Sequence, residues 1–355
     1  MKRTAISVLP ALLFLAVGCA PSAPPSTPPP PFPAAELEAP VEDAALLCNA
    51  SARVTSWKSI KVPENYRAVD VALTPDRVWV LLAPPALVSL PREGEVGQPM
   101  FSVPRGEADW SAIDTDPVDG SLWIASSNAY RLVHVSPDGN QQRIDLKRVQ
   151  GEGGLRQLRM GRDRIYGVPV CADEALWIFN REGELVDYTF EAAERMADLD
   201  TARTVNMGYA CPTVFMARGE AGEVMALNPQ DVKLYRAGEG KKWDVVGGPW
   251  ELEPPGRYTD IADLRKVKLE GVGDAYYLPD LVNRLFLYRG SPVLLGGGVS
   301  ERHNFRGTLL YRVEGNTLTP VVEVCGRQML IDVESDGKGY AAITPRDLVV
   351  GRFAG

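Results

Sequence analysis

Polar residues that offer oxygen ligands recur at a similar distance before a series of aromatic residues. Four of them stand nine residues before the aromatic residue, and two more stand seven or eight residues before it. These six residues are Asp70, Asp114, Gln157, Asn206, Glu270 and Asp332. Carboxylate and amide oxygens are ligands that suit Ca²⁺ or Mg²⁺. One hypothesis is therefore a divalent-ion site, and the alternative is a set of acids that face water in a channel or fix turns.

The candidates for acid–base catalysis are few. The chain contains two histidines, and His134 stands out of phase with its apolar neighbours in LVHVS, which predicts a position on a strand surface. His303 follows Glu301 in a Gly-rich segment, so this pair is a candidate catalytic acid and base, with a solvated loop as the alternative. The chain has no Gly-x-Ser-x-Gly, His-Glu-x-x-His or phosphate-loop motif.

The elements that would position these residues form a repeated unit, which is clearest in residues 111–146. LWIAS, RLVHVS and QRIDL read as strands, and Asp-Gly pairs stand in the turns between alternating runs. Four such antiparallel strands make one blade of a β-propeller. The polar residues above fall on the first strand of each unit, which lines the central channel of a propeller.

Aromatic residues mark the second strand of each unit and give the number of blades. The markers are Trp79, Trp123, Tyr166, Phe215, Tyr277 and Tyr340. Their first two spacings, 44 and 43 residues, match the propeller period, and the later spacings of 49, 62 and 63 need insertions. The pattern favours an all-β propeller of six blades, with seven as the alternative. The C-terminal unit supplies only three strands, so we expect the lone strand at residues 54–62 to join it and close the ring.

The pattern resembles the propeller superfamily of NHL-repeat, streptogramin-lyase-like and SMP-30/gluconolactonase-like proteins. The resemblance is carried by DGSLW at Asp119–Trp123 and SPDG at Ser136–Gly139, and it extends over residues 54–353. It implies a channel ion held by Glu, Asn and Asp side chains if the chain is like the SMP-30 enzymes. The same fold hosts both enzymes and inert scaffolds, so the resemblance predicts the fold better than the function.

The N-terminus carries the signature of an exported lipoprotein. Lys2 and Arg3 precede a short apolar run at residues 6–17, and LAVGC ending at Cys19 resembles a bacterial lipobox. A Pro-rich tether at residues 20–40 cannot pack a core and favours polyproline II. We therefore expect a signal peptide at 1–18, a lipidated Cys19 with its tether at 19–53, and a propeller at 54–355. Ala20, in place of Asp, favours the outer membrane, with the propeller in the periplasm or on the cell surface.

Four further cysteines allow more than one arrangement in an exported chain. Cys48 and Cys325 both flank the proposed closing blade and are the candidate disulfide, whereas Cys171 and Cys211 fall at opposite ends of a blade. Buried free thiols are the alternative.

Two classes of function remain open. The net charge of −8 disfavours nucleic acid as a partner. The first class is an envelope-tethered module that binds a protein or small ligand through a propeller face. The alternative is a divalent-ion-dependent hydrolase or lyase that acts on a small ester, lactone or cyclic peptide. The scarcity of histidine and the lack of a nucleophile motif favour the first class.

The lipobox gives a direct test of the anchor. Replacement of the lipidated cysteine, Cys19→Ser, should release the protein from membranes, because several acyl chains, at about 0.8 kcal/mol per buried CH₂, would hold the native chain there. The measurement is the distribution of the protein between membrane and soluble fractions after a salt wash. Retention of the variant in the membrane fraction would contradict the lipoprotein assignment.

Overall fold

The structure is a computed structural model, in which the chain divides into two compact units, Met1–Pro31 and Phe32–Gly355. All of the residues that the structure describes belong to the second unit. The described residues are 47–48, 54–92, 109–149, 153–170, 172, 174–191, 214–219, 222–228, 233–238, 242–248, 265–269, 273–277, 284–288, 291–296, 308–314, 317–324, 332–336, 338–344 and 347–353. These residues form β-strands and turns, and none of their elements is a helix long and apolar enough to cross a membrane.

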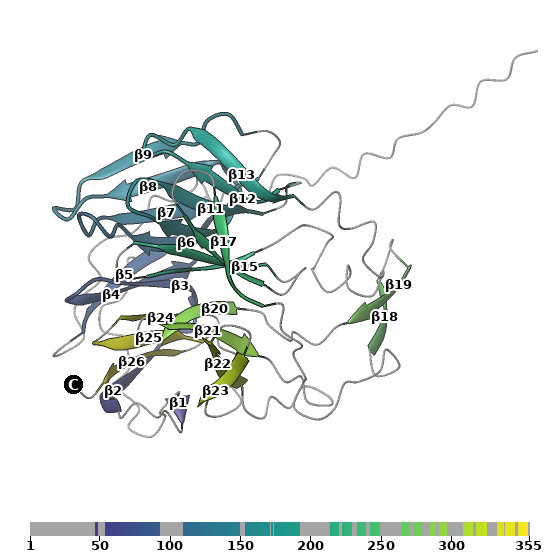
Figure 1. Cartoon of the computed structure of the whole chain (residues 1–355). Coiled ribbons are helices and arrows are strands. Elements are labelled where there is room, and N and C mark those ends of the chain that lie inside the picture. The colour runs from purple at the N-terminus through teal and green to yellow at the C-terminus, as the bar shows by residue number, and fades with distance from the viewer. Residues whose placement is uncertain are drawn as a thin grey trace, which may run out of the picture. The chain divides into compact units, whose positions relative to one another are not determined.

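Five antiparallel sheets of four or more strands form the blades of a β-propeller (Figure 1). Three of them are meanders whose strands pair in chain order. These contain β6 Trp110–Thr115, β7 Leu122–Ser126, β8 Arg131–Val135 and β9 Gln141–Asp145; β10 Leu155–Met160, β11 Ile165–Pro169, β12 Glu174–Phe179 and β13 Leu185–Glu191; and β14 Phe215–Arg218, β15 Val224–Asn228, β16 Lys233–Ala237 and β17 Trp243–Gly247.

The other two blades each recruit a strand from the N-terminal part of the chain. In one blade the order is β1-β23-β22-β21-β20, and in the other it is β2-β26-β25-β24. The bounds are β1 Leu47–Cys48, β2 Val54–Lys61, β20 Arg284–Tyr288, β21 Ser291–Gly296, β22 Thr308–Glu314, β23 Thr317–Val324, β24 Asp332–Asp336, β25 Gly339–Ile343 and β26 Asp347–Phe353.

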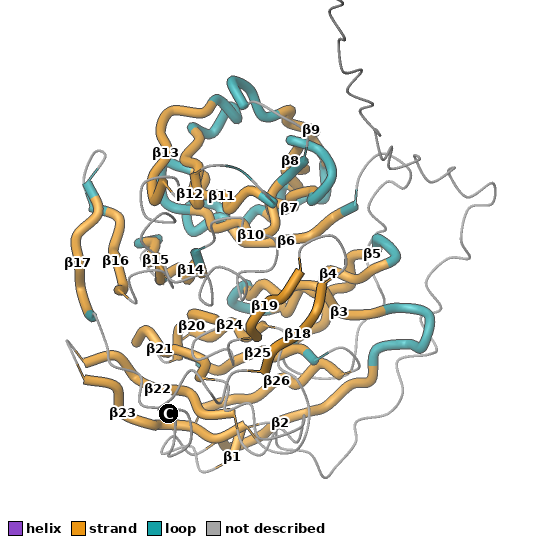
Figure 2. The backbone as a smooth tube through the Cα atoms, turned by 90° about the vertical axis from the view of Figure 1, so that its right-hand side faces the viewer, coloured by secondary structure: helices purple, strands orange, loops and turns teal. Residues whose placement is uncertain are grey.

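Two smaller sheets complete the described part of the chain. One has the three strands β3 Arg67–Leu73, β4 Arg77–Ala83 and β5 Ala86–Pro91, and the other has the two strands β18 Arg265–Leu269 and β19 Gly273–Tyr277. The innermost strands of the five blades and of the three-stranded sheet contact one another in the order β3, β6, β10, β14, β20, β24 and back to β3 (Figure 2). Their side chains therefore share one central channel.

The predicted number of blades, six with seven as the alternative, is wrong, because the described residues contain five sheets of four or more strands. The error came from the aromatic markers. Phe215 lies on β14, which is an innermost strand, and Tyr277 lies on β19 of the two-stranded sheet. An aromatic side chain packs equally well on either strand of a hairpin, so its type alone does not distinguish the first strand of a unit from the second.

The strand at Val54–Lys61 lies beside the C-terminal strands. It pairs antiparallel with β26, from Val54 opposite Phe353 to Lys61 opposite Asp347. Ile60 is fully buried in a cluster with residues of β25 and β26 and residues of the three-stranded sheet, including Ile343, Leu348 and Val78. The pairing thus covers the edge of β26, and the side chain of Ile60 packs between this sheet and the three-stranded sheet.

Packing between sheets explains why the second strands of the blades lack a strict alternation of apolar and polar residues. All five residues of β7 are buried, and so are all five of β11, because each sheet packs against a neighbour on both faces. By contrast, the outermost strand β9 is mostly exposed. The Asp-Gly turns that the sequence predicted are present, and Gly120 and Gly139 adopt φ values of 74° and 87°, which glycine tolerates without strain.

Ion pairs join neighbouring sheets at equivalent places. Asp116 follows β6 and binds the guanidinium of Arg181, which follows the third strand of the next blade. Asp336 ends β24 and binds Arg92, which follows the third strand of the next sheet. The same pairing in two places indicates that it belongs to the repeat.

The pairing of β2 predicts a strong dependence of stability on that strand. A chain that begins at residue 62 should unfold at a much lower temperature than a chain that begins at residue 54, because β26 then loses its ladder partner and Ile60 no longer fills its cluster. The measurement is thermal unfolding followed by circular dichroism. Both chains lack β1, so the comparison isolates β2, and equal midpoints would show that the pairing does not stabilise the fold.

Candidate functional site

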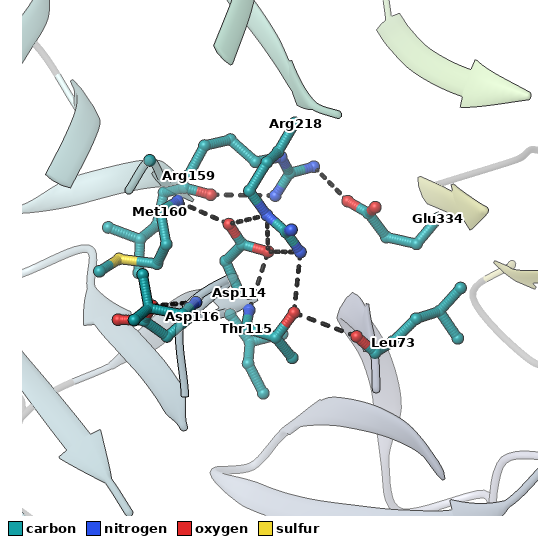
Figure 3. A network of polar contacts seen from close by, with 12 residues as sticks. Leu73, Asp114, Thr115, Asp116, Arg159, Met160, Arg218 and Glu334 are labelled. Atoms are coloured by element: carbon teal, nitrogen blue, oxygen red, sulfur yellow. Dashed lines mark hydrogen bonds and ion pairs between the residues drawn. The ribbon is translucent and has the colours of Figure 1, made fainter. Parts of the chain in front are cut away.

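Charged side chains from five innermost strands, β3, β6, β10, β14 and β24, meet in the channel. Asp114 on β6 is 1% exposed and lies against Arg218 on β14, with Nε–Oδ2 and Nη2–Oδ1 distances of 3.2 Å (Figure 3). The carboxylate also accepts hydrogen bonds from the backbone N–H groups of Thr115, at 2.8 Å, and Met160, at 2.6 Å. Arg218 further donates to the hydroxyl of Thr115 at 2.8 Å. Both oxygens of Asp114 are therefore fully engaged by the protein.

A second ion pair crosses the channel. Arg159 on β10 binds Glu334 on β24, with an Nη2–Oε1 distance of 2.8 Å (Figure 3). Burial raises the pKa of Glu334 to about 7, and the nearby carboxyls of Asp332 and Asp114 add to this, while Arg159 opposes it. Burial alone would lower the pKa of Arg159, but Glu334 and three aspartates raise it above its ordinary value. The arginine therefore stays charged, and the glutamate changes its protonation near neutral pH.

Asp70 and Asp332 form a different kind of pair. Asp70 accepts hydrogen bonds from the N–H of Val71 at 3.0 Å and of Ile113 at 2.7 Å. Asp332 is 8% exposed, and its carboxyl lies beside that of Asp70, close enough for a hydrogen bond between the two carboxyls. Burial raises the pKa of Asp70 well above its ordinary value, and the adjacent Asp332 raises it further. Two carboxyls this close favour holding a shared proton over double ionisation.

A cavity of about 50 Å³ adjoins this pair. Its polar lining includes both aspartates and the arginines Arg156 and Arg159, and its apolar lining includes Met216. Pockets for drug-sized ligands are about 300–1,000 Å³, so this cavity suits a small group.

Three residues that line the cavity lie at β-bulges in successive inner strands. The strand register skips one residue at Val69 in β3, at Ser111 in β6 and at Arg156 in β10. All three residues line the cavity. Bulges redirect side chains and occur often beside active sites, so the repeated bulge indicates a feature of the propeller that shapes this end of the channel.

The structure brings together three of the predicted channel acids. Asp70 and Asp332 lie at the cavity, Asp114 lies against Arg218, and Gln157 accepts a hydrogen bond from the N–H of Met216 at 3.1 Å. Within the described part of the chain, no group of three or more His, Cys, Asp or Glu side chains is placed to hold a metal ion. Asn206 and Glu270 lie outside the described residues, so the predicted divalent-ion site stays a prediction.

Other predicted site residues lie outside the described residues. These are Cys19, Asn206, Glu270, Glu301, His303 and Cys325. Cys48 lies on β1 opposite Glu323, and its side chain is likewise not described. His134 is half-buried on β8, and its ring lies 4.6 Å from that of Trp123.

Sequence reasoning missed the charged partners Arg159, Arg218 and Glu334. Two of them stand two residues after a predicted channel residue, in Gln157-x-Arg159 and Asp332-x-Glu334, and alternate residues of a strand share a face. This two-residue spacing was the feature of the sequence from which Arg159 and Glu334 could have been identified. Arg218 had no such signal, because its strand was assigned to the wrong place in its unit.

Comparisons with known proteins support the fold. No protein-family model matches the chain, and no curated protein matches its sequence. A solved gluconolactonase from Xanthomonas campestris is 12% identical, with a TM-score of 0.52 over 91% of this chain and 99% of that one. A putative gluconolactonase is 11% identical, with a TM-score of 0.52 over 86% and 97%.

A catalytically inactive virginiamycin B lyase from Staphylococcus aureus, solved with quinupristin, is 9% identical. Its TM-score is 0.50 over 83% of this chain and 99% of that one. At such identities the likeness shows the fold alone, a β-propeller.

The raised pKa of Glu334 predicts a pH-dependent cost of folding. The folded protein holds the proton of Glu334 up to about pH 7, whereas an unfolded chain loses it near the ordinary value of 4.5. The stability of the native protein relative to Glu334→Gln should therefore fall as pH rises from about 4.5 to about 7, and then level off.

The measurement is the free energy of urea unfolding across that pH range. Glu182→Gln, in an exposed turn, is the control and should parallel the native protein. Curves for Glu334→Gln that also run parallel to the native protein at every pH would contradict the assignment.

Proposed function

We propose that this chain is an envelope-tethered lipoprotein whose β-propeller binds a small ligand at the channel cavity. The observation that carries the proposal is the cavity itself, whose polar lining comes from the innermost strands and includes Asp70, Asp332 and Gln157. The three bulges that surround the cavity support the same proposal.

The rest of the channel has a structural role in this proposal. Asp114 and Glu334 are held by arginine side chains, and those pairs tie the innermost strands together. The cavity residues differ, because Asp70 and Asp332 lie beside each other and line a space that can hold a small group. In the cell the lipid on Cys19 and the Pro-rich tether would hold the propeller at the outer membrane, where it would meet small solutes or an envelope partner.

A second candidate is a hydrolase or lyase that acts on a small ester, lactone or cyclic peptide. It is favoured by the acid pair, in which Asp70 holds a proton at a pH where an ordinary aspartate has lost it, since a general acid needs that property. The solved relatives include gluconolactonase and virginiamycin B lyase propellers, and this likeness is compatible with the candidate. Turnover of a lactone or ester that is lost in Asp70→Asn would select it over ligand binding.

The binding proposal is tested by closing the cavity. Val69→Phe adds a ring at a bulge residue of the cavity lining and should abolish retention of the ligand. The protein would be mixed with a small-molecule extract and passed through gel filtration, and bound compounds would be identified by mass spectrometry. Val245→Phe makes the same change at an exposed position on β17 and should retain the ligand. Equal recovery by both variants would place any ligand elsewhere.

A further inference from the structure

Opposite walls of the cavity carry groups of opposite charge. The innermost strands follow one another around the channel in the order β3, β6, β10, β14, β20 and β24, so β10 lies across the channel from β24 (Figure 2). Asp70 on β3 and Asp332 on β24 line one side of the cavity, while Arg156 and Arg159 on β10 line the other. The ion pair of Arg159 with Glu334 on β24 shows that these two strands face each other. The cavity therefore has an electric field that points from β10 towards the aspartates.

A field of this kind disfavours an ion of either sign. A cation beside Asp70 and Asp332 meets the arginines of the opposite wall, and an anion beside the arginines meets the aspartates, because the cavity is only about 50 Å³ in volume. A neutral group with a large dipole aligns with the field and avoids both repulsions. A peptide-like amide has such a dipole, about 3.5 D, with an acceptor at one end and a donor at the other.

We propose that the cavity binds a neutral carboxamide group, whose carbonyl oxygen faces β10 and whose N–H group faces the aspartates of β3 and β24. The inference rests on the proposed ligand-binding function and names the chemical class of the group that enters the cavity. Arginine side chains only donate hydrogen bonds and ionised carboxylates only accept them, so a group held between the two must do both. Hydrogen bonds to a charged partner are about twice as strong as those between neutral groups.

The rest of the polar lining and the volume fit a group of this kind. Gln157 on β10 is itself a carboxamide and Ser111 on β6 carries a hydroxyl, so both side chains can donate and accept. One water needs roughly 10–15 Å³ of such a volume, so about 50 Å³ admits a group of about four non-hydrogen atoms. An acetamide-sized group has that size. The cavity thus accepts the amide end of a ligand and excludes a drug-sized molecule.

The experiment is a saturation-transfer NMR titration of the full chain, at neutral pH, with four molecules of one shape. Acetamide, acetate, acetamidinium and acetone are all small and planar at the central carbon, but only acetamide is neutral and has both a donor and an acceptor. Acetamide should bind saturably within about 50 mM, a range suited to a fragment of this size. Each of the other three should bind at least fivefold more weakly, because acetate and acetamidinium are charged and acetone has no donor.

A variant of the positive wall tests the origin of this selectivity. Arg156→Gln removes one charge from the wall that repels a cation, so the affinity for acetamidinium relative to acetamide should rise at least fivefold. The control is Arg143→Gln, which makes the same change on β9 at a side chain that is 45% exposed and outside the cavity lining. Its affinity ratio should equal that of the native protein. The ratio compares two ligands on one protein, so a smaller folded fraction of a variant does not alter it.

Three results would each overturn the proposal. These are binding of acetate, acetamidinium or acetone as tight as that of acetamide, no saturation by acetamide in this range, and the same affinity ratio in Arg156→Gln and Arg143→Gln. The wider binding proposal fails differently. If Val69→Phe loses a cellular compound without an amide group that Val245→Phe retains, the cavity is a ligand site and only the carboxamide class is wrong.

Discussion

The neutralisation of buried charge in the channel is the interaction on which the rest of this propeller depends. The innermost strands bring their side chains into one narrow space, and a carboxylate there cannot be hydrated as it would be at the surface. Asp114 accepts hydrogen bonds from its own strand, from β10 and from β14. Arg159 on β10 forms an ion pair with Glu334 on β24. Each pair therefore ties together strands that are far apart in the sequence.

These pairs do more to specify the arrangement of the strands than to increase stability. The desolvation of two charges often offsets their attraction, so a buried ion pair adds little net stability compared with an apolar replacement. Loss of one partner, however, leaves the other charge buried and alone, which costs about 3–5 kcal/mol. An arrangement of sheets that separated Asp114 from Arg218 would carry that cost. The ion pairs of Asp116 with Arg181 and of Asp336 with Arg92 act similarly between adjacent sheets.

The sequence predicted the features of the fold that depend on short segments and that recur along the chain. The Asp-Gly turns, the strands around Trp123 and the propeller class follow from short-range patterns, and the pairing of residues 54–61 follows from a unit that lacks one strand. The number of blades was wrong because Phe215 was assigned to a second strand. The pairing of Asp114 with Arg218 was not predictable from spacing, since these residues are 104 positions apart.

The two groups of channel acids differ in the groups that lie against them. Asp114 and Asp332 come from the same kind of inner strand and are both buried, yet Asp114 is paired with an arginine whereas Asp332 lies beside another carboxyl, that of Asp70. A purely structural channel would gain by replacing Asp332 with a neutral residue, because its charge raises the pKa of Asp70 at a cost to folding. The charge of Asp332 therefore lowers the stability of the fold at the cavity that the three bulge residues line.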